Sequence, residues 1–350
     1  METGWNQIEL NQIIDLMRNG FSGKQVDFVT QFPVTRIETI ADGKINFAKV
    51  GFVEKIPRSY KLAEGDILIS NINSIKHMGK VAQFSNKLDS FHGMNLLILR
   101  IKDNVEKTFI FYLLQFNKSW FERMASQAVN QASINQTIIR SKILFIPKSK
   151  REQTKIAEIL SAVDKAIEQT EAIIAKQQRI KTGLMQDLLT KGIDENGNIR
   201  SEETHEFKDS PPGRIPAEWE WATIDDISIY VGSGITPKGG ENVYSKEGVL
   251  FIRSQNVSFE GLLLNNVAHI PVSINKKMKR SEVFAHDVLL NITGASIGRC
   301  CPVPRNLGRA NVNQHVCAIR MRETNQDDAN FLSTILESSI GQNQIEKFNA

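Results

Sequence analysis

Amide, hydroxyl and basic side chains, the groups that contact nucleic acid, gather in two separate parts of this 350-residue sequence. Asparagine and glutamine can pair with adenine through two hydrogen bonds and arginine with guanine, whereas lysine mostly contacts phosphate. The N-terminal set is Arg36, Ser70, Asn71, Asn73, Lys76, His77, Lys80, Asn130, Gln131, Ser133, Asn135 and Gln136. The C-terminal set is Arg253, Asn291, Thr293, Ser296, Arg299, Arg309, Asn311, Asn313 and Gln314. Any one of them could be a solvated turn residue, but their clustering beside basic residues in both parts predicts two surfaces that contact nucleic acid.

Motifs for catalysis are missing from the sequence. It contains neither the G-x-x-x-x-G-K-[ST] loop of nucleotide-binding proteins nor the G-x-S-x-G and H-E-x-x-H patterns of common hydrolases. Two glycine-rich segments have simpler interpretations, since GSGITPKGG at 232–240 is typical of a mobile loop and TGASIG at 293–298 of a hairpin. We therefore expect a protein with no catalytic residues and no bound cofactor.

The three cysteines, Cys300, Cys301 and Cys317, leave two interpretations open. Together with His315 they could bind zinc, but adjacent cysteines do not match the usual C-x2-C spacing. Buried thiols in strands, without a metal, are the preferred interpretation. So few cysteines fit a reducing compartment, and the sequence has neither an apolar run long enough to cross a membrane nor a signal peptide in its polar N-terminus. These features predict a cytoplasmic protein with no membrane partner.

The elements that must position these surfaces are organised around a long helix, predicted over 149–191. Its apolar residues recur at alternating steps of four and three, which is the seam of a helix that packs against another helix. The seam residues are Ile156, Leu160, Val163, Ile167, Ile174, Leu184 and Leu188. A helix of this length spans roughly 60 Å at 1.5 Å per residue. Such a length favours a spacer between two globular bodies over an amphipathic helix on the surface of one domain.

Composition on either side of the helix predicts two globular domains. Residues 1–148 contain short β-type runs separated by turn signals, a lead-in at 6–17 that is a short helix or irregular, a helix over 108–125 and a closing strand within 138–148. Residues 192–212 predict a linker, and 213–350 a second domain. The predicted fold class is α+β, with two similar domains, each a mixed β-sheet with short helices, separated by a long coiled-coil-type helix.

An internal repeat relates the two domains. GDILISN at 65–71 matches HDVLLNI at 286–292, which places Asp66 opposite Asp287. At nearly constant spacing along the chain, further matches pair Gly79-Lys80 with Gly298-Arg299, Arg100 with Arg320, Phe111 with Phe331, and Arg36 and Ile40 with Arg253 and Val257. Unrelated strands can look alike, but the matching turns and basic residues favour a duplication. The second copy ends before counterparts of 130–148 and of the long helix, so we expect it to be incomplete at its C-terminus.

The charge distribution permits a polyanionic partner without requiring one. The net charge is +4 at pH 7 and the pI is ≈ 8.8. Basic residues concentrate in the predicted domains, at 76–80, 118–124, 275–280 and 304–309. Two similar domains on a rigid spacer could each contact a short piece of duplex, separated by on the order of one to two turns of DNA.

The sequence resembles the specificity subunits of type I restriction-modification systems. The strongest likeness lies in 145–193, where a P…EQ…I…IL…D opening leads into a long helix, as in the central conserved region of that family. GDILISN, TGASIG and NVNQHV resemble recurrent motifs of the family's target recognition domains. Two features depart from the family pattern, since the proline-rich dipeptide before Glu152 is reduced to Pro147 and the distal conserved helix is absent.

The resemblance implies two target recognition domains, each recognising one half of a split site in double-stranded DNA, and a helix that docks methyltransferase subunits. Those subunits would hold S-adenosylmethionine, carry out the chemistry and bring in the restriction and translocase subunits, while the specificity subunit is not catalytic. A seam without a partner in the same chain also leads us to expect self-association through the helix. The alternatives are a coiled-coil adaptor with protein-binding β-rich ends and, more remotely, a stand-alone DNA methyltransferase.

Overall fold

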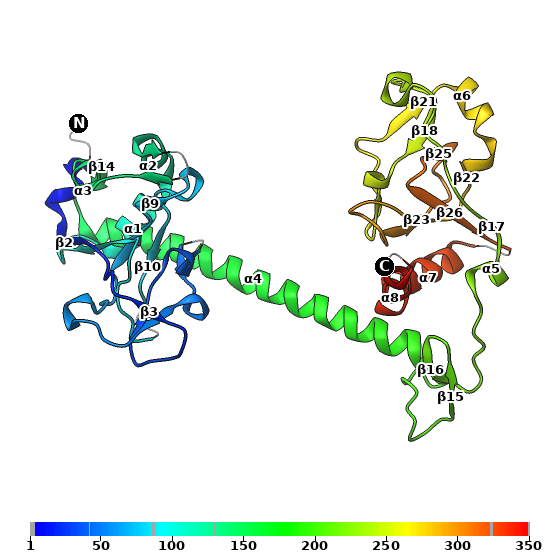
Figure 1. Ribbon diagram of the computed structural model, residues 1–350, viewed down its shortest axis with the longest axis horizontal. Helices are drawn as coiled ribbons and strands as arrows, with labels where there is room; N and C mark the ends of the chain where they lie inside the picture. The colour runs from blue at the N-terminus through cyan, green and yellow to red at the C-terminus, as the bar shows by residue number, and fades with distance from the viewer. Residues whose placement is uncertain (1–3, 42, 86–87, 129–130, 323–324, 349–350) are drawn as a thin grey trace. The chain divides into compact units, whose positions relative to one another are not determined.

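The computed structural model describes residues 4–41, 43–85, 88–128, 131–322 and 325–348, with the side chains of Gln127, Ala128 and Gln131 left out. The chain divides into two compact units, Met1–Ala172 and Ile173–Ala350. The boundary falls within one continuous helix, α4 (Lys150–Thr190), which Figure 1 shows. The helix agrees closely with the one predicted over 149–191.

The first unit is built around a sheet whose strands run in the order β10-β8-β11-β2, each antiparallel to its neighbour. Its strands are β1 Trp5–Glu9, β2 Ile14–Asn19, β3 Gln25–Val26, β4 Pro33–Val34, β5 Ile40–Ala41, β6 Lys44–Ile45, β7 Gly51–Val53, β8 Ile67–Ile69, β9 Ile72–Asn73, β10 Val81–Gln83, β11 Leu97–Ile101, β12 Ser126–Ala128, β13 Gln131–Ser133 and β14 Ile143–Pro147. Its helices besides α4 are α1 Lys107–Phe116, α2 Lys118–Met124 and α3 Gln136–Arg140.

Both faces of this sheet are buried. On one face Ile67 and Ile69 pack with Leu114 of α1, and on the other Leu68 packs with Ile98 and a second apolar cluster. A strand covered on both faces has no polar alternation, which explains why β8, within GDILISN, consists of the apolar residues Ile67, Leu68 and Ile69 alone.

Two local predictions for this unit were wrong. The lead-in at 6–17 forms β1, a short 3₁₀ helix (Leu10–Gln12) and β2, because β1 pairs with β14 and β2 with β11. These partners lie far along the chain, so tertiary pairing overrides the local preference. The single helix predicted over 108–125 is divided at Asn117, which caps the end of α1 and the start of α2. The closing strand within 138–148 is confirmed as β14.

The second unit repeats the central sheet of the first, in the order β24-β23-β26-β17. Beside it lies a sheet in the order β21-β18-β25-β22, and α7 packs on β23 and β24. The strands of this unit are β15 Phe207–Ser210, β16 Gly213–Pro216, β17 Ser228–Ser233, β18 Val249–Ile252, β19 Val257–Ser258, β20 Gly261–Leu262, β21 Ala268–Ile270, β22 Glu282–Val283, β23 Val288–Asn291, β24 Cys300–Pro302, β25 Ala310–Val312 and β26 Val316–Met321. Its helices besides α4 are α5 Ile224–Ile227, α6 Val272–Lys277, α7 Gln326–Glu337 and α8 Ser339–Lys347.

The predicted repeat is confirmed by a buried ion pair that recurs in both units. Arg100 donates to both carboxylate oxygens of Asp66 at 2.8 and 2.7 Å, and Arg320 does the same to Asp287 at 2.8 and 2.7 Å. Both aspartates are only 1% exposed, whereas both arginines reach solvent. Each pair joins the start of one central strand, β8 or β23, to the neighbouring strand, β11 or β26.

The first turns of α4 belong to the core of the first unit. Ala157 is buried there and Ile156 packs against it, while Tyr112 of α1 donates a hydrogen bond of 2.7 Å to Asp164. Beyond these turns the seam is exposed, by 38% at Leu160, 52% at Ile167 and 63% at Ile174. An apolar stripe therefore faces solvent along α4 within this chain.

The segment predicted as a linker, 192–212, is partly folded. Its end forms a hairpin in which β15 pairs with β16, and Ile193 bridges Ile199 at its start. Arg214 links the hairpin to Glu202 at 3.0 Å. The charges that indicated a solvated linker serve here as ion pairs on the surface.

Candidate nucleic-acid interface

In the first unit, the structure brings the two predicted polar clusters together. The hairpin between β8 and β10, residues 70–80, carries β9, which pairs with β13 in the order β12-β13-β9. Asn73 lies opposite Ala132, and the Ile134 amide donates to the Asn71 carbonyl at 3.0 Å. Segments about sixty residues apart thus form one polar surface. Asn130 lies outside the described residues, and of Gln131 only the backbone is described.

Several of these side chains hold the hairpin rather than face solvent. Ser70 and Asn71 are buried, at 2% and 5% exposure. Asn73 donates to Ser70 Oγ at 3.2 Å and accepts from the Ser74 amide at 2.8 Å. Asn135 caps α3 by accepting from the Ile138 amide at 2.9 Å. Such bonds fix the loop conformation and so orient the exposed groups beside them.

Basic groups dominate what the hairpin exposes. Lys76 is exposed, and His77 and Lys80 are half-buried. The pKa of His77 is lowered by partial desolvation and then by the positive charges of Lys80, Lys76 and Lys118. Lys118 comes from α2. It lies in the basic cluster 118–124 seen in the sequence, but it was not predicted as a site residue, because no local pattern indicates that α2 packs on this hairpin.

Arg36, a predicted DNA contact, makes structural contacts within its own loop. It forms an ion pair with Glu38 at 2.9 Å and donates to the Lys49 carbonyl at 3.4 Å. Its backbone also starts the 3₁₀ helix Ile37–Thr39. These contacts hold the loop around β5 and β6.

The second unit presents the equivalent hairpin, residues 291–299. The Asn291 amide donates to the Arg299 carbonyl at 2.8 Å and the Gly298 amide to the Asn291 carbonyl at 2.9 Å. The same two bonds join Ser70 to Lys80 and Gly79 to Ser70 in the first unit, both at 2.9 Å. The hairpin predicted for TGASIG is thus confirmed, and Asn291 takes the structural place of Ser70.

A network of exposed and half-buried polar side chains lies beside this hairpin. Thr293 hydrogen-bonds to His315 Nδ1, Gln314 lies 3.0 Å from His315 Nε2, and Thr236 donates to Gln314 Oε1. Sequence reasoning missed Thr236 and His315 as members. The signal for Thr236 was available in the glycine-rich loop at 232–240, which was predicted to be mobile.

The start of that loop is held in place by Gly234. Its amide donates to the carbonyls of Asn313 and Val316, both at 3.2 Å. A Cβ on this glycine would lie 1.8 Å from the Val312 carbonyl oxygen, so no larger residue fits without moving the backbone. The close approach aligns Thr236 with Gln314.

Three predicted asparagines of the second unit have internal roles. Asn311 is fully buried and donates to Asn275 Oδ1 at 2.8 Å and to the Met278 carbonyl at 2.9 Å. Asn291 is also fully buried, and donates to the Ser254 carbonyl at 2.9 Å and Ser296 Oγ at 3.1 Å. Asn313 is 8% exposed and accepts from the His315 amide at 3.2 Å. Asn291 and Asn311 were both predicted to contact DNA, and their complete burial contradicts that prediction, since both amides are used inside the fold.

Two predicted arginines of this unit lie apart from the network. Arg253 donates to the Asn266 carbonyl at 3.3 Å and lies 5.5 Å from the ring of Tyr244. Arg309 contacts Glu282 at 3.5 Å.

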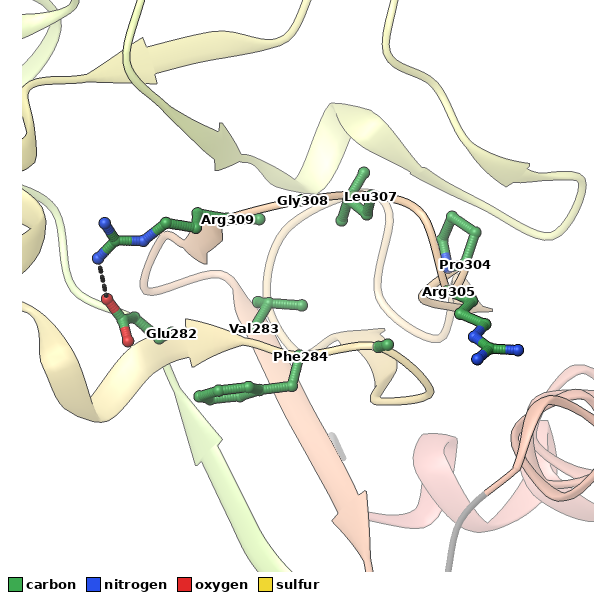
Figure 2. Close-up of a pocket in the computed structure, with 10 residues that line it drawn as sticks. Glu282, Val283, Phe284, Pro304, Arg305, Leu307, Gly308 and Arg309 are labelled. Carbon is green, nitrogen blue, oxygen red and sulfur yellow. Dashed lines mark hydrogen bonds and ion pairs between the residues drawn. The ribbon is translucent and has the colours of Figure 1, made fainter.

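Figure 2 shows Arg309 lining a cavity of about 230 Å³. Val283, Phe284 and Leu307 also line this cavity. Arg309 precedes β25, whose other end leads to Asn313, so the strand separates it from the network.

The cysteines are strand residues, as predicted. Cys300 and Cys301 lie in β24 and Cys317 in β26, and all are buried. Burial raises the pKa of Cys300 to about 11 and that of Cys301 to about 12. In the described ranges, no cluster of three or more His, Cys, Asp or Glu side chains could hold a metal ion. None of the helices in the part of the chain that the structure describes is long and apolar enough to span a membrane.

Known structures share the fold. The S subunit of a type I restriction-modification system from M. genitalium matches with a TM-score of 0.56 and 14% identity, over 98% of this chain and 79% of that one. A chain from a structure concerned with complex assembly and conformational transition of the type I R-M system matches with a TM-score of 0.54 and 14% identity, over 95% and 79%. At this identity the likeness concerns the fold alone.

Sequence relatives point to the same family. The putative type I restriction enzyme MjaX specificity subunit of Methanocaldococcus jannaschii is 36% identical over 297 residues, which cover 82% of this chain and 66% of the relative. The type I restriction enzyme MjaVIII specificity subunit of the same organism is 24% identical over 300 residues, or 84% and 65%. The chain thus spans just under two thirds of the length of these relatives. The family model described as type I restriction modification DNA specificity domain matches residues 2–177. This chain belongs to the type I restriction-modification DNA specificity family.

Proposed function

We propose that this chain is the DNA-recognition subunit of a type I restriction-modification complex, and that each unit contacts one half of a bipartite duplex site. The observation that carries the proposal is the repeated hairpin, 70–80 and 291–299. In both units the same sheet order presents it beside polar and basic side chains. The names of the sequence relatives, specificity subunits, support the same role.

The two hairpins offer different chemistry to DNA. The second unit offers amide, hydroxyl and imidazole groups from Gln314, Thr293 and His315, which suit the donor and acceptor pattern of base edges in the major groove. The first unit offers lysines, which suit phosphate. Because buried bonds already fix the backbone of both hairpins, only the exposed side chains have to become ordered on binding, and that favours affinity.

The exposed stripe on α4 is the proposed docking surface for protein partners. Leu160, Val163 and Ile167 are 38%, 51% and 52% exposed, an unusual amount for a seam of this regularity. Methyltransferase subunits are the proposed partners, and through them the restriction and translocase subunits. In this scheme the partners carry out the chemistry and this chain supplies recognition. A second copy of this chain is the other proposed occupant of the stripe.

The test is to co-express the chain with a methyltransferase subunit of a type I system and to map adenine methylation. A split motif with a fixed gap supports two units that read separate half-sites. A symmetric motif supports two copies that pair through α4. A stable complex without any methylated motif contradicts the DNA-recognition role and favours the coiled-coil adaptor, which the exposed stripe would also fit.

A further inference from the structure

The helix that supports each hairpin differs in charge between the two units. In the first unit α2 follows α1 after one residue, and in the second α8 follows α7 after one residue. Gly79 packs on Phe121 of α2, where a Cβ would lie 2.4 Å from the Phe121 Cβ. Gly298 lies against Gln342 of α8, where a Cβ would lie 2.3 Å from Gln342 Oε1, and its carbonyl accepts from Gln342 Nε2 at 3.0 Å. These contacts make α2 and α8 structural counterparts.

Lys118 is placed by α2 next to the basic hairpin of the first unit. It precedes Phe121 by three residues, and residues at this spacing share one face of a helix. That face is the one in contact with Gly79, between His77 and Lys80. The lowered pKa of His77 has Lys118 among its causes, which agrees with this placement.

The ion pair between Lys118 and Glu122 is weak enough for Lys118 to bind a phosphate instead. The two side chains form an ion pair of 2.6 Å, and they are 39% and 32% exposed, respectively. A pair of this kind on a helix surface contributes little to stability. A phosphate can therefore replace the carboxylate at small cost, and it would also relieve the repulsion among the lysines.

The second unit has a different group at this place. Ser339 is the first residue of α8, as Lys118 is the first residue of α2, and it donates to Gln186 at 2.7 Å. The charged residues of α8 are Glu346 and Lys347, near its other end. On the hairpin of this unit the basic residue is Arg299.

We propose that Lys118 forms, with Lys76 and Lys80, a phosphate-binding site of the first unit, for which the second unit has no equivalent on α8. This proposal rests on the proposed function, because it assigns the DNA backbone as the ligand. It follows that the first unit supplies more of the salt-dependent affinity and the second unit relatively more of the base recognition.

The experiment measures binding of the full chain to an unselected pool of random-sequence 30-base-pair duplexes at several salt concentrations. The slope of log Kobs against log salt reports the number of phosphate contacts, at about 0.9 for each. Lys118→Gln is expected to reduce the slope by about 1 while leaving sequence preference unchanged. Arg123→Gln is the matched control. Arg123 lies on the same helix, but its charge is felt by Lys142, which lies over the ring of Trp120. The control is expected to keep the slope of the original chain.

The reverse change provides a second readout. Ser339→Lys places an equivalent charge in the second unit and is expected to raise the slope by about 1. An unchanged slope in Lys118→Gln, or an equal loss in Arg123→Gln, overturns the proposal. Selection of bound duplexes from the same pool tests the proposed function separately. A chain that enriches no sequence contradicts the proposed function. The salt slopes of the variants still decide whether Lys118 contacts phosphate.

Discussion

The buried ion pair that repeats in the two units makes a sharp prediction about their stability. Asp66 accepts hydrogen bonds from Arg100 on both carboxylate oxygens and from the Ala63 amide at 2.7 Å. In Asp66→Asn the amide group must turn its NH2 toward at least one of these donors. The variant therefore keeps the shape of the side chain but loses a charged acceptor and places two donors face to face.

The magnitude follows from burial. Breaking a fully buried pair costs about 3–5 kcal/mol, and a hydrogen bond to a charged group contributes about 1.5–3 kcal/mol. Arg100 is 33% exposed and can turn to water, so the cost lies toward the lower values. We expect Asp66→Asn to lower the stability of the first unit by about 2–3 kcal/mol.

Hydrogen exchange measured by mass spectrometry can assign this loss to one unit. A change of 2–3 kcal/mol raises the exchange rate of amides in β8 and β11 by about 30- to 150-fold. Asp287→Asn is the matched variant, with the same two hydrogen bonds from the arginine to the carboxylate, and should act on β23 and β26 alone. Unchanged exchange in the strands next to the substitution, or equal changes in both units, would refute the reasoning.

Three further predictions concern recognition, association and thiol chemistry. Gln314→Ala should relax DNA preference at one base pair by about 1–3 kcal/mol in a competition binding assay, with the salt slope unchanged. Ile167→Glu should abolish concentration-dependent association and copurification of the methyltransferase subunit, while the melting temperature stays the same because this side chain is 52% exposed. Cys300 and Cys301, whose pKa values are raised to about 11 and 12, are protonated at pH 8, so an alkylating reagent should modify them only as fast as the second unit opens.

The long helix could be predicted because its signal is local, and the repeat because the same motifs occur twice in the sequence. The seam of α4 needs only the spacing of apolar residues within a few turns. Asp66 and Arg100 were recognised through their matched positions opposite Asp287 and Arg320, although the sequence did not reveal that they form ion pairs. The internal repeat thus identified the two residues of each buried ion pair before their contact was known.

The remaining features depend on which distant segments pair. Asn311 and Gln314 are polar neighbours in the sequence, but β25 carries Asn311 into the core and the following turn brings Gln314 to the surface. Lys118 lies beside the hairpin only because α2 packs on Gly79. The strands at 5–9 and 14–19 likewise exist through partners far along the chain, such as Leu144 for Ile8 and Leu99 for Met17.

The two hairpins carry different exposed groups on the same scaffold, as the proposed recognition of two different half-sites requires. Buried polar groups, Ser70 in one unit and Asn291 in the other, carry the bonds that close the loop. The exposed positions contribute little to those bonds, so they can change without destabilising the sheet. At the exposed positions the first unit carries lysines, and the second carries amide and hydroxyl groups. A substitution at an exposed hairpin position should therefore alter DNA binding far more than stability, whereas a substitution at Ser70 or Asn291 should impair both.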